Sequence, residues 1–199
     1  MTKFLLVRHA LTDSVGKVLS GRSAGIHLNN EGKAQADHLG QRLSDLKIDA
    51  IYSSPLERAL ETASPVAETH NLSINVSDDL TEINFGSWTN KKIEELRNDS
   101  DFIAFNTLRS STRIPDGELI SEAQTRIISK LEQLSSVPEN RTIVVVSHAD
   151  IIKSALVWYA GIPVDLMNRI EISPACISIV ELYDNNARIV CVNNCGNIL

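Results

Sequence analysis

Two short apolar runs, each followed by a histidine, constrain the fold of this chain most. Residues 4–7 read Phe-Leu-Leu-Val and precede Arg8 and His9, while residues 143–146 read Ile-Val-Val-Val and precede, after one serine, His148. Short continuous apolar runs of this kind are typical of strands buried on both faces of a parallel sheet. Ligands of open α/β sheets bind at the carboxyl ends of such strands, so we expect both imidazoles at one functional edge.

The alternation of strand and helix patterns predicts the fold class. Strands are predicted at 3–8, 49–53, 74–77, 142–147, 176–183 and 188–193, and helices at 31–46, with Asn29 or Asn30 as cap, and at 118–135. A short polar turn, Asp184-Asn185-Asn186, joins the last two strands as a hairpin. We therefore expect an α/β fold, a three-layer α/β/α sandwich with a mostly parallel central sheet and an antiparallel edge.

The domain organisation is expected to be simple. The chain has 199 residues, which suits one domain, and no repeat or linker divides it, so we interpret residues 1–199 as a single domain. The polar segment 89–117, broken by Pro115 and Gly117, predicts an inserted helical excursion of two short helices lying over the sheet. Loops that reach over a rigid sheet often set substrate choice.

Charge and cysteine content limit the partners and the compartment. The formal net charge of −6 argues against nucleic acid, and no apolar run approaches the roughly 20 residues of a membrane helix, so we expect neither nucleic acid nor membrane as partner. The odd, low number of cysteines, Cys176, Cys191 and Cys195, predicts reduced thiols and a cytoplasmic location. Cys191 and Cys195 make only half a metal site, so we expect no metal.

A second arginine follows another predicted strand. Ser54 suits a helix cap, Pro55 the first helical position and Glu57 a capping box, which places Arg58 in the first turn of a helix that Pro65 should end or kink. Free N–H groups and the positive end of the helix dipole favour an anion there. The alternative is that Arg58 is a solvated surface charge.

This inventory suits phosphoryl transfer. Arginine supplies permanent, bidentate donors for a phosphate, and a neutral imidazole nitrogen can attack phosphorus. The leaving oxygen then needs a proton from a carboxylic acid of raised pKa. Glu82, which is followed by apolar and small residues, is the candidate acid, although a lone glutamate is more often a surface charge.

With these motifs in order, the chain resembles the histidine phosphatase superfamily, in the branch of the phosphoglycerate mutases and their small phosphatase relatives. The resemblance is carried by Arg8-His9-Ala10 with Thr12, by Ser53-Ser54-Pro55-Leu56 with Arg58, Ala59 and Thr62, by Leu80, Glu82, Gly86 and Trp88, and by Val146-Ser147-His148. Residues 25–36, with Leu28, Gly32, Gln35 and Ala36, resemble the first loop and helix of the family.

The resemblance implies a role for each site residue. His9 is the nucleophile that carries a transient phosphohistidine, Glu82 is the acid that later helps water to attack, and no metal or organic cofactor is needed. The phosphoryl oxygens are held by Arg8, Arg58 and His148, with Thr12 as a pocket hydroxyl. Arg22 could contact a second anionic group of the substrate, and the same holds for Lys17, Arg109 and Arg113. For each of the four, a solvated surface charge is the favoured interpretation.

Two departures from the family pattern affect the pocket. Ala10 replaces the usual glycine, which is tolerable only if its φ is negative. Val15 stands where many relatives carry an asparagine, which removes one hydrogen bond to phosphate.

We therefore predict a metal-independent phosphomonoesterase that hydrolyses a small phosphorylated metabolite through phosphohistidine. The alternatives are mutase-type phosphotransfer, a phosphohistidine protein phosphatase and a non-catalytic protein that binds a phospholigand. The resemblance favours a phosphatase over a mutase. Mutases of this family carry a longer insert between the acid and second histidine motifs, with an adjacent arginine pair that holds the substrate carboxylate. Here the span from Glu82 to His148 is short and has no such pair. A homodimer is retained as an alternative to a monomer.

Overall fold

The computed structural model describes residues 1–137, 140–184 and 186–196 and confirms the predicted fold class. The sheet has six strands in the order β3-β2-β4-β1-β5-β6. Their bounds are Thr2–Arg8 (β1), Ala50–Ser53 (β2), Ile74–Val76 (β3), Arg141–Ser147 (β4), Ile177–Tyr183 (β5) and Asn186–Asn194 (β6). Strand β1 pairs with β4, β4 with β2 and β2 with β3, all in parallel. Strand β5 pairs antiparallel with both β1 and β6, so β5 and β6 form the predicted antiparallel edge. Asn185 of the predicted turn lies outside the described residues.

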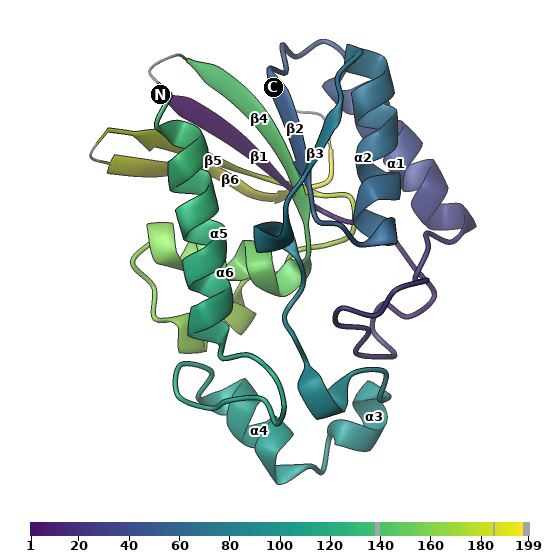
Figure 1. Ribbon diagram of the computed structural model, residues 1–199, viewed down its shortest axis with the longest axis vertical. Helices are drawn as coiled ribbons and strands as arrows, with labels where there is room; N and C mark the ends of the chain where they lie inside the picture. The colour runs from purple at the N-terminus through teal and green to yellow at the C-terminus, as the bar shows by residue number, and fades with distance from the viewer. Residues whose placement is uncertain (138–139, 185, 197–199) are drawn as a thin grey trace.

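Two pairs of helices cover the two faces of the sheet (Figure 1). Their bounds are Asn30–Leu43 (α1), Glu57–His70 (α2), Ile120–Ser135 (α5) and Ala149–Tyr159 (α6). Alternate residues of a strand face opposite sides of its sheet. Accordingly Leu5 and Val7 pack in the core under α1 and α2, whereas Phe4 and Leu6 pack under α5 and α6. The side chain of Asn29 caps α1, as predicted, by accepting a hydrogen bond from the amide of Gly32.

The inserted excursion contains two short helices, as predicted: α3 (Ile93–Leu96) and α4 (Ser100–Thr107). Both lie beyond the carboxyl ends of the strands, whereas we expected them over the sheet (Figure 1). Trp88 accounts for this position, because it is 1% exposed and its ring meets those of Phe102 and Phe105 at centroid distances of 5.3 and 5.6 Å. Short 3₁₀ helices occur at Asp78–Leu80 (η1), Gly86–Trp88 (η2) and Val164–Arg169 (η3).

Helix α2 differs from prediction at its start and at its proline. It begins at Glu57 with Leu56 as N-cap and has no side-chain cap, so the predicted capping by Ser54 is wrong. It also continues beyond Pro65 to His70, so of the two outcomes predicted for this proline, an end or a kink, the end is wrong. A proline inside a helix costs roughly 3 kcal/mol. Tertiary packing offsets that cost here, since Val66 and its neighbours are buried against α1.

The expectation of three reduced thiols is also wrong. Cys176 and Cys195 form a disulfide, and Cys191 is the free cysteine. The two partners are 19 positions apart, and the hairpin of β5 and β6 returns the chain to its starting edge, which brings them together. This pairing cannot be predicted from the number of cysteines alone.

In the described part of the chain no helix combines the length and the apolar character of a membrane span.

Candidate active site

Adjacent parallel strands bring the two predicted histidines together. Arg8 at the end of β1 is in register with Ser147 at the end of β4, so His9 and His148 follow at the same edge. Their ring centroids are 5.2 Å apart. The backbone N–H of His9 also donates to the carbonyl of Ser147 at 2.8 Å, which ties the two strand ends to each other.

His9 is held as a neutral imidazole that faces the pocket. Its Nδ1 lies 2.7 Å from the carbonyl oxygen of Ala10, and Nδ1–H is the donor because a carbonyl only accepts. The lone pair is therefore on Nε2. Burial, and then the charge of Arg58, lowers the pKa of His9 to about 3, so the ring is uncharged at neutral pH.

Thr62 joins the loop of His9 to the helix of Arg58. Its hydroxyl accepts from the amide of Ala10 at 2.9 Å and donates to the carbonyl of Arg58 at 2.6 Å. Ala10 is fully buried beside Leu28 and does not have a positive φ, so the backbone tolerates its methyl group. The backbone that follows the candidate nucleophile is thus fixed on both sides.

Two guanidinium groups line the same pocket with unused donors. Arg58 lies in the first turn of α2, is 2% exposed and donates through Nη2 to the carbonyl of Gly21 at 2.7 Å. Arg8 donates through Nη1 to the carbonyl of Ile172 at 2.6 Å. Among the described residues, Nη1 of Arg58 and Nε of Arg8 have no partner, although both atoms are buried. Buried unpaired donors are costly, so this arrangement suits a bound anion.

Glu82 has the character of a protonated acid. Its Oε1 accepts from the amide of Ile83 at 2.9 Å, and its Oε2 lies 4.0 Å from Nδ1 of His148. Burial, followed by repulsion from Asp150, raises the pKa of Glu82 to about 7, against the opposing charges of Arg58 and Arg8. Near neutral pH a large fraction of this carboxyl group therefore keeps its proton.

His148 lies behind the pocket rather than in its wall. It is fully buried, its Nε2 lies 2.9 Å from the Ser54 hydroxyl, and its Nδ1 lies 3.4 Å from Nη2 of Arg58. Ser54, which sequence patterns suggested as a helix cap, instead fixes this ring. Burial, together with the charges around it, lowers the pKa of His148 well below its usual range.

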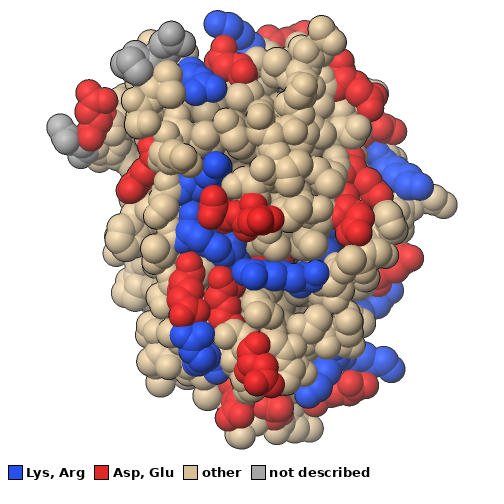
Figure 2. Space-filling model, viewed as in Figure 1, with Lys and Arg blue, Asp and Glu red and all other residues tan. Residues whose placement is uncertain are grey.

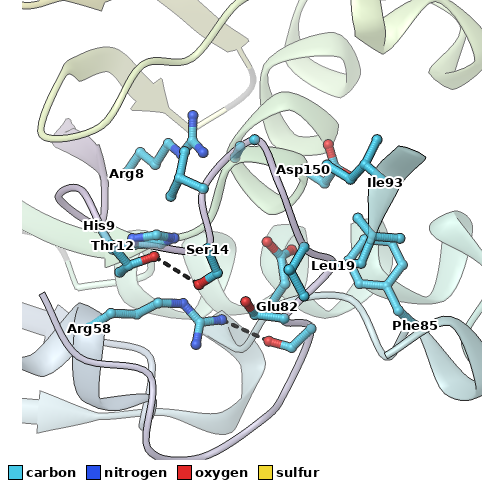
Figure 3. Close-up of a pocket in the computed structure, with 16 residues that line it drawn as sticks. Arg8, His9, Thr12, Ser14, Leu19, Arg58, Glu82, Phe85, Ile93 and Asp150 are labelled. Carbon is cyan, nitrogen blue, oxygen red and sulfur yellow. Dashed lines mark hydrogen bonds between the residues drawn. The ribbon is translucent and has the colours of Figure 1, made fainter. Parts of the chain in front are cut away.

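The pocket itself is small, with a volume of about 170 Å³. Figure 3 shows Arg8, His9 and Arg58 on one side, Glu82 near the centre, and Phe85, Ile93 and Asp150 on the other side. Thr12, whose hydroxyl was predicted to belong to the phosphate pocket, lines the pocket together with Ser14. The two hydroxyl oxygens are 3.1 Å apart. Val15, one of the departures from the family pattern, lines it as well.

A network around Glu118 holds the loop of Glu82, and the sequence did not reveal it. Glu118 accepts from the amide of Asn84 and from Arg22, both at 3.0 Å, and from Nε of Arg126 at 3.0 Å. Arg22 and Arg126 each donate in turn to the carbonyl of Glu82, at 2.8 and 3.2 Å. Arg22 is not among the residues that line the pocket, and its assignment to substrate binding stays a prediction.

The two arginines of the excursion behave differently from each other. Arg113 is exposed and pairs with Glu122, which is close to the expected solvated charge. Arg109 is 5% exposed, so that interpretation is wrong for it. Its Nη1 donates to the carboxylate of Asp150 at 3.2 Å. Asp150 lines the pocket and was not singled out from the sequence.

Gly86 closes the loop of Glu82 against the end of the excursion. Its φ is +46°, and a Cβ atom at this position would lie 2.1 Å from the carbonyl oxygen of Pro115. The amide of Ser87 donates to the same carbonyl at 2.9 Å. Neither the backbone conformation nor the space at Gly86 admits a side chain.

We expect Gly86→Ala to lower the melting temperature by roughly 5–10 °C, because the left-handed φ costs about 1 kcal/mol and the backbone clash adds to it. Gly161→Ala is the matched control: its φ is +66°, but no heavy atom lies within 4 Å of its Cβ position. Thermal unfolding of both variants separates the two costs. Equal losses would mean that Pro115 moves aside freely.

Whole-chain comparisons agree with this geometry. The family model of the histidine phosphatase superfamily (branch 1) matches residues 4–195. Phosphoserine phosphatase 1 of Hydrogenobacter thermophilus is 30% identical over 97% of this chain and 92% of its own, and a probable phosphoglycerate mutase, GpmB, of Erwinia tasmaniensis is 29% identical over 91% and 85%. A mutant phosphoserine phosphatase of Entamoeba histolytica, solved with phosphoserine, superposes with a TM-score of 0.89 at 27% identity over the whole of both chains. This chain belongs to the histidine phosphatase superfamily, branch 1.

Proposed function

We propose that this protein is a metal-independent phosphomonoesterase that hydrolyses a small phosphorylated metabolite through a phosphohistidine on His9. The observation that carries the proposal is a neutral imidazole in one small pocket with two guanidinium groups, each of which has a buried donor atom without a partner among the described residues. Such a site binds a phosphate dianion and presents a nucleophile to it. The names of the relatives, among them phosphoserine phosphatase, support a small substrate.

In the first step, Nε2 of His9 attacks phosphorus and the bond from phosphorus to the alcohol oxygen breaks. Donors of Arg8 and Arg58 hold the phosphoryl oxygens, where they stabilise the charge of the transition state. Glu82, protonated because its pKa is raised to about 7, gives its proton to the leaving oxygen. The alcohol departs neutral, and phosphorus is bonded to Nε2.

In the second step, water attacks phosphorus and the bond to Nε2 breaks. The carboxylate left on Glu82 accepts a proton from that water, so the acid is restored and inorganic phosphate leaves. His148 contributes from behind. A guanidinium group only donates, so Nδ1 of His148 accepts from Nη2 of Arg58 at 3.4 Å and the proton is on Nε2, which donates to the Ser54 hydroxyl oxygen at 2.9 Å. His148 thereby orients Arg58 toward the phosphate site.

Side chains supply all of the charge that this chemistry requires. Among the residues that the structure describes, no three histidine, cysteine or acidic side chains gather in the manner of a metal site. Two guanidinium groups take the place that a cation fills in metal-dependent phosphatases. The same pocket chemistry would serve a mutase. The span from Glu82 to His148 is short and lacks the adjacent arginine pair expected of a mutase of this family, which favours hydrolysis.

The decisive test is hydrolysis of 4-nitrophenyl phosphate in excess chelator. We expect turnover that EDTA does not reduce, together with a phosphoenzyme that is labile in acid and stable in base, detected by ³¹P NMR after rapid quenching. Whatever 3-phosphoglycerate is turned over should yield free phosphate rather than an isomer. Loss of turnover in EDTA that is restored by a divalent cation would contradict metal independence, and an isomerised product would identify a mutase.

A further inference from the structure

The pocket is chemically two-sided. Arg8 and Arg58 are the only lysine or arginine residues among those that line it, and they lie on the side of His9. The opposite side in Figure 3 carries the apolar side chains of Phe85 and Ile93, together with Asp150. If phosphate occupies the cationic side, the alcohol part of the substrate meets an apolar wall and one carboxylate.

Asp150 is fixed in that wall by a buried partner. It lies in the first turn of α6, and its Oδ2 accepts from Nη1 of Arg109 at 3.2 Å. Arg109 is itself held by the Asn106 side chain at 2.8 Å and lies over the ring of Phe105, 4.5 Å from its centroid. Among the described residues, no group donates a hydrogen bond to Oδ1 of Asp150, so this oxygen is available to a ligand.

In the ion pair of Arg109 with Asp150, the carboxylate faces the pocket and the guanidinium group does not. The side chain of Arg109 is 6% exposed and is not part of the lining, whereas that of Asp150 is 18% exposed and is part of it. Asp150 also repels the Glu82 carboxylate and attracts the Arg8 guanidinium, so its charge is felt at the reacting groups. A ligand that passes the phosphate site therefore meets the carboxylate end of this ion pair, with Oδ1 of Asp150 turned to no donor among the described residues.

We propose that Asp150 makes the leaving-group side of the pocket selective for a phosphate ester whose alcohol carries an ammonium group, and selective against one that carries a carboxylate. The inference rests on the proposed phosphatase function and specifies its substrate class. An ammonium group can donate to Oδ1 of Asp150, while a carboxylate at the same place meets a like charge without a cation to receive it.

The first test uses the unaltered protein and three phosphonates of similar size. The compounds are 2-aminoethylphosphonate, propylphosphonate and 2-carboxyethylphosphonate, and their dissociation constants are measured by titration calorimetry at pH 7. We expect the ammonium compound to bind about tenfold more tightly than the propyl compound, and the carboxylate compound about tenfold more weakly, from one charge pair in a partly solvated site. Equal constants, or tighter binding of the carboxylate, would overturn the proposal.

The second test replaces the charge and keeps the shape. Asp150→Asn should bring the three dissociation constants together, so that the ratios of the ammonium and carboxylate compounds to propylphosphonate approach one. The loss of a charge near Arg8 and Glu82 changes the affinity for the shared phosphonate group by a common factor, which these ratios remove. Asp37→Asn, on the exposed face of α1, is the matched control and should keep the original order. Ratios that stay unchanged in Asp150→Asn would refute selection by the charge of Asp150.

These measurements separate the two proposals. Binding is measured without turnover, so the order of the three phosphonates tests the role of Asp150 even in a protein that hydrolyses nothing. Hydrolysis of 4-nitrophenyl phosphate, which carries neither an ammonium group nor a carboxylate, tests the phosphatase function alone. Hydrolysis without discrimination between the phosphonates would refute only the proposal for Asp150.

Discussion

Replacing His9 by alanine should reduce the turnover of 4-nitrophenyl phosphate by about 10⁴-fold or more, because the covalent route is then closed. His148 cannot take over as nucleophile. It is fully buried, it is not among the residues that line the pocket, and its Nε2 is engaged by Ser54. The phosphoenzyme seen in the unaltered protein should be absent from this variant.

Two controls keep this result specific. Phosphate should still raise the melting temperature of the His9→Ala protein, since Arg8 and Arg58 remain in place and bind the anion. His38→Ala, which removes an exposed imidazole from α1, should leave turnover unchanged. Turnover of the His9→Ala protein within tenfold of the unaltered level would remove His9 from the role of nucleophile.

The strands, the layers and the position of the site could be predicted because local patterns determine them. Residues 4–7 and 143–146 are short apolar runs typical of buried strands. Each observed strand agrees with its predicted span to within two residues. Parallel pairing of β1 with β4 then places His9 beside His148. A histidine that directly follows a buried strand can therefore be placed at the edge of the sheet from the sequence alone.

Other features depend on contacts between distant segments, which a local pattern does not contain. Ser54 has the signature of a helix cap, yet its hydroxyl contacts His148, 94 positions away. Pro65 was predicted to end or kink its helix, but the helix continues beyond it, where Val66 packs against α1. The burial of Arg109 follows from the aromatic cluster of the excursion and from Asp150, which the helix pattern of α6 presents as an ordinary first-turn acid. These failures all concern residues whose partners are distant in the sequence.

Replacing Glu82 by glutamine should separate substrates by the quality of their leaving group. An alkoxide is a poor leaving group that needs a proton, so kcat/KM for an alkyl phosphate should fall by about 10²–10⁴-fold, the usual contribution of a general acid. Nitrophenolate leaves without protonation, so kcat/KM for 4-nitrophenyl phosphate should fall by about tenfold or less. The ratio kcat/KM reports only the steps up to and including phosphoenzyme formation. It is therefore insensitive to the slower attack of water on the phosphoenzyme, which the substitution also causes.

The pH dependence provides a second, independent signature of the same group. The acid works only when it is protonated, and burial raises its pKa to about 7, so kcat/KM of the unaltered protein for an alkyl phosphate should decline as the pH rises through about 7. In Glu82→Gln that decline should disappear, because an amide does not titrate. Glu94→Gln, on the exposed side of α3, should retain it. Equal losses for alkyl and aryl substrates, or an unchanged decline above pH 7 in the Glu82→Gln protein, would assign the proton donor to another residue.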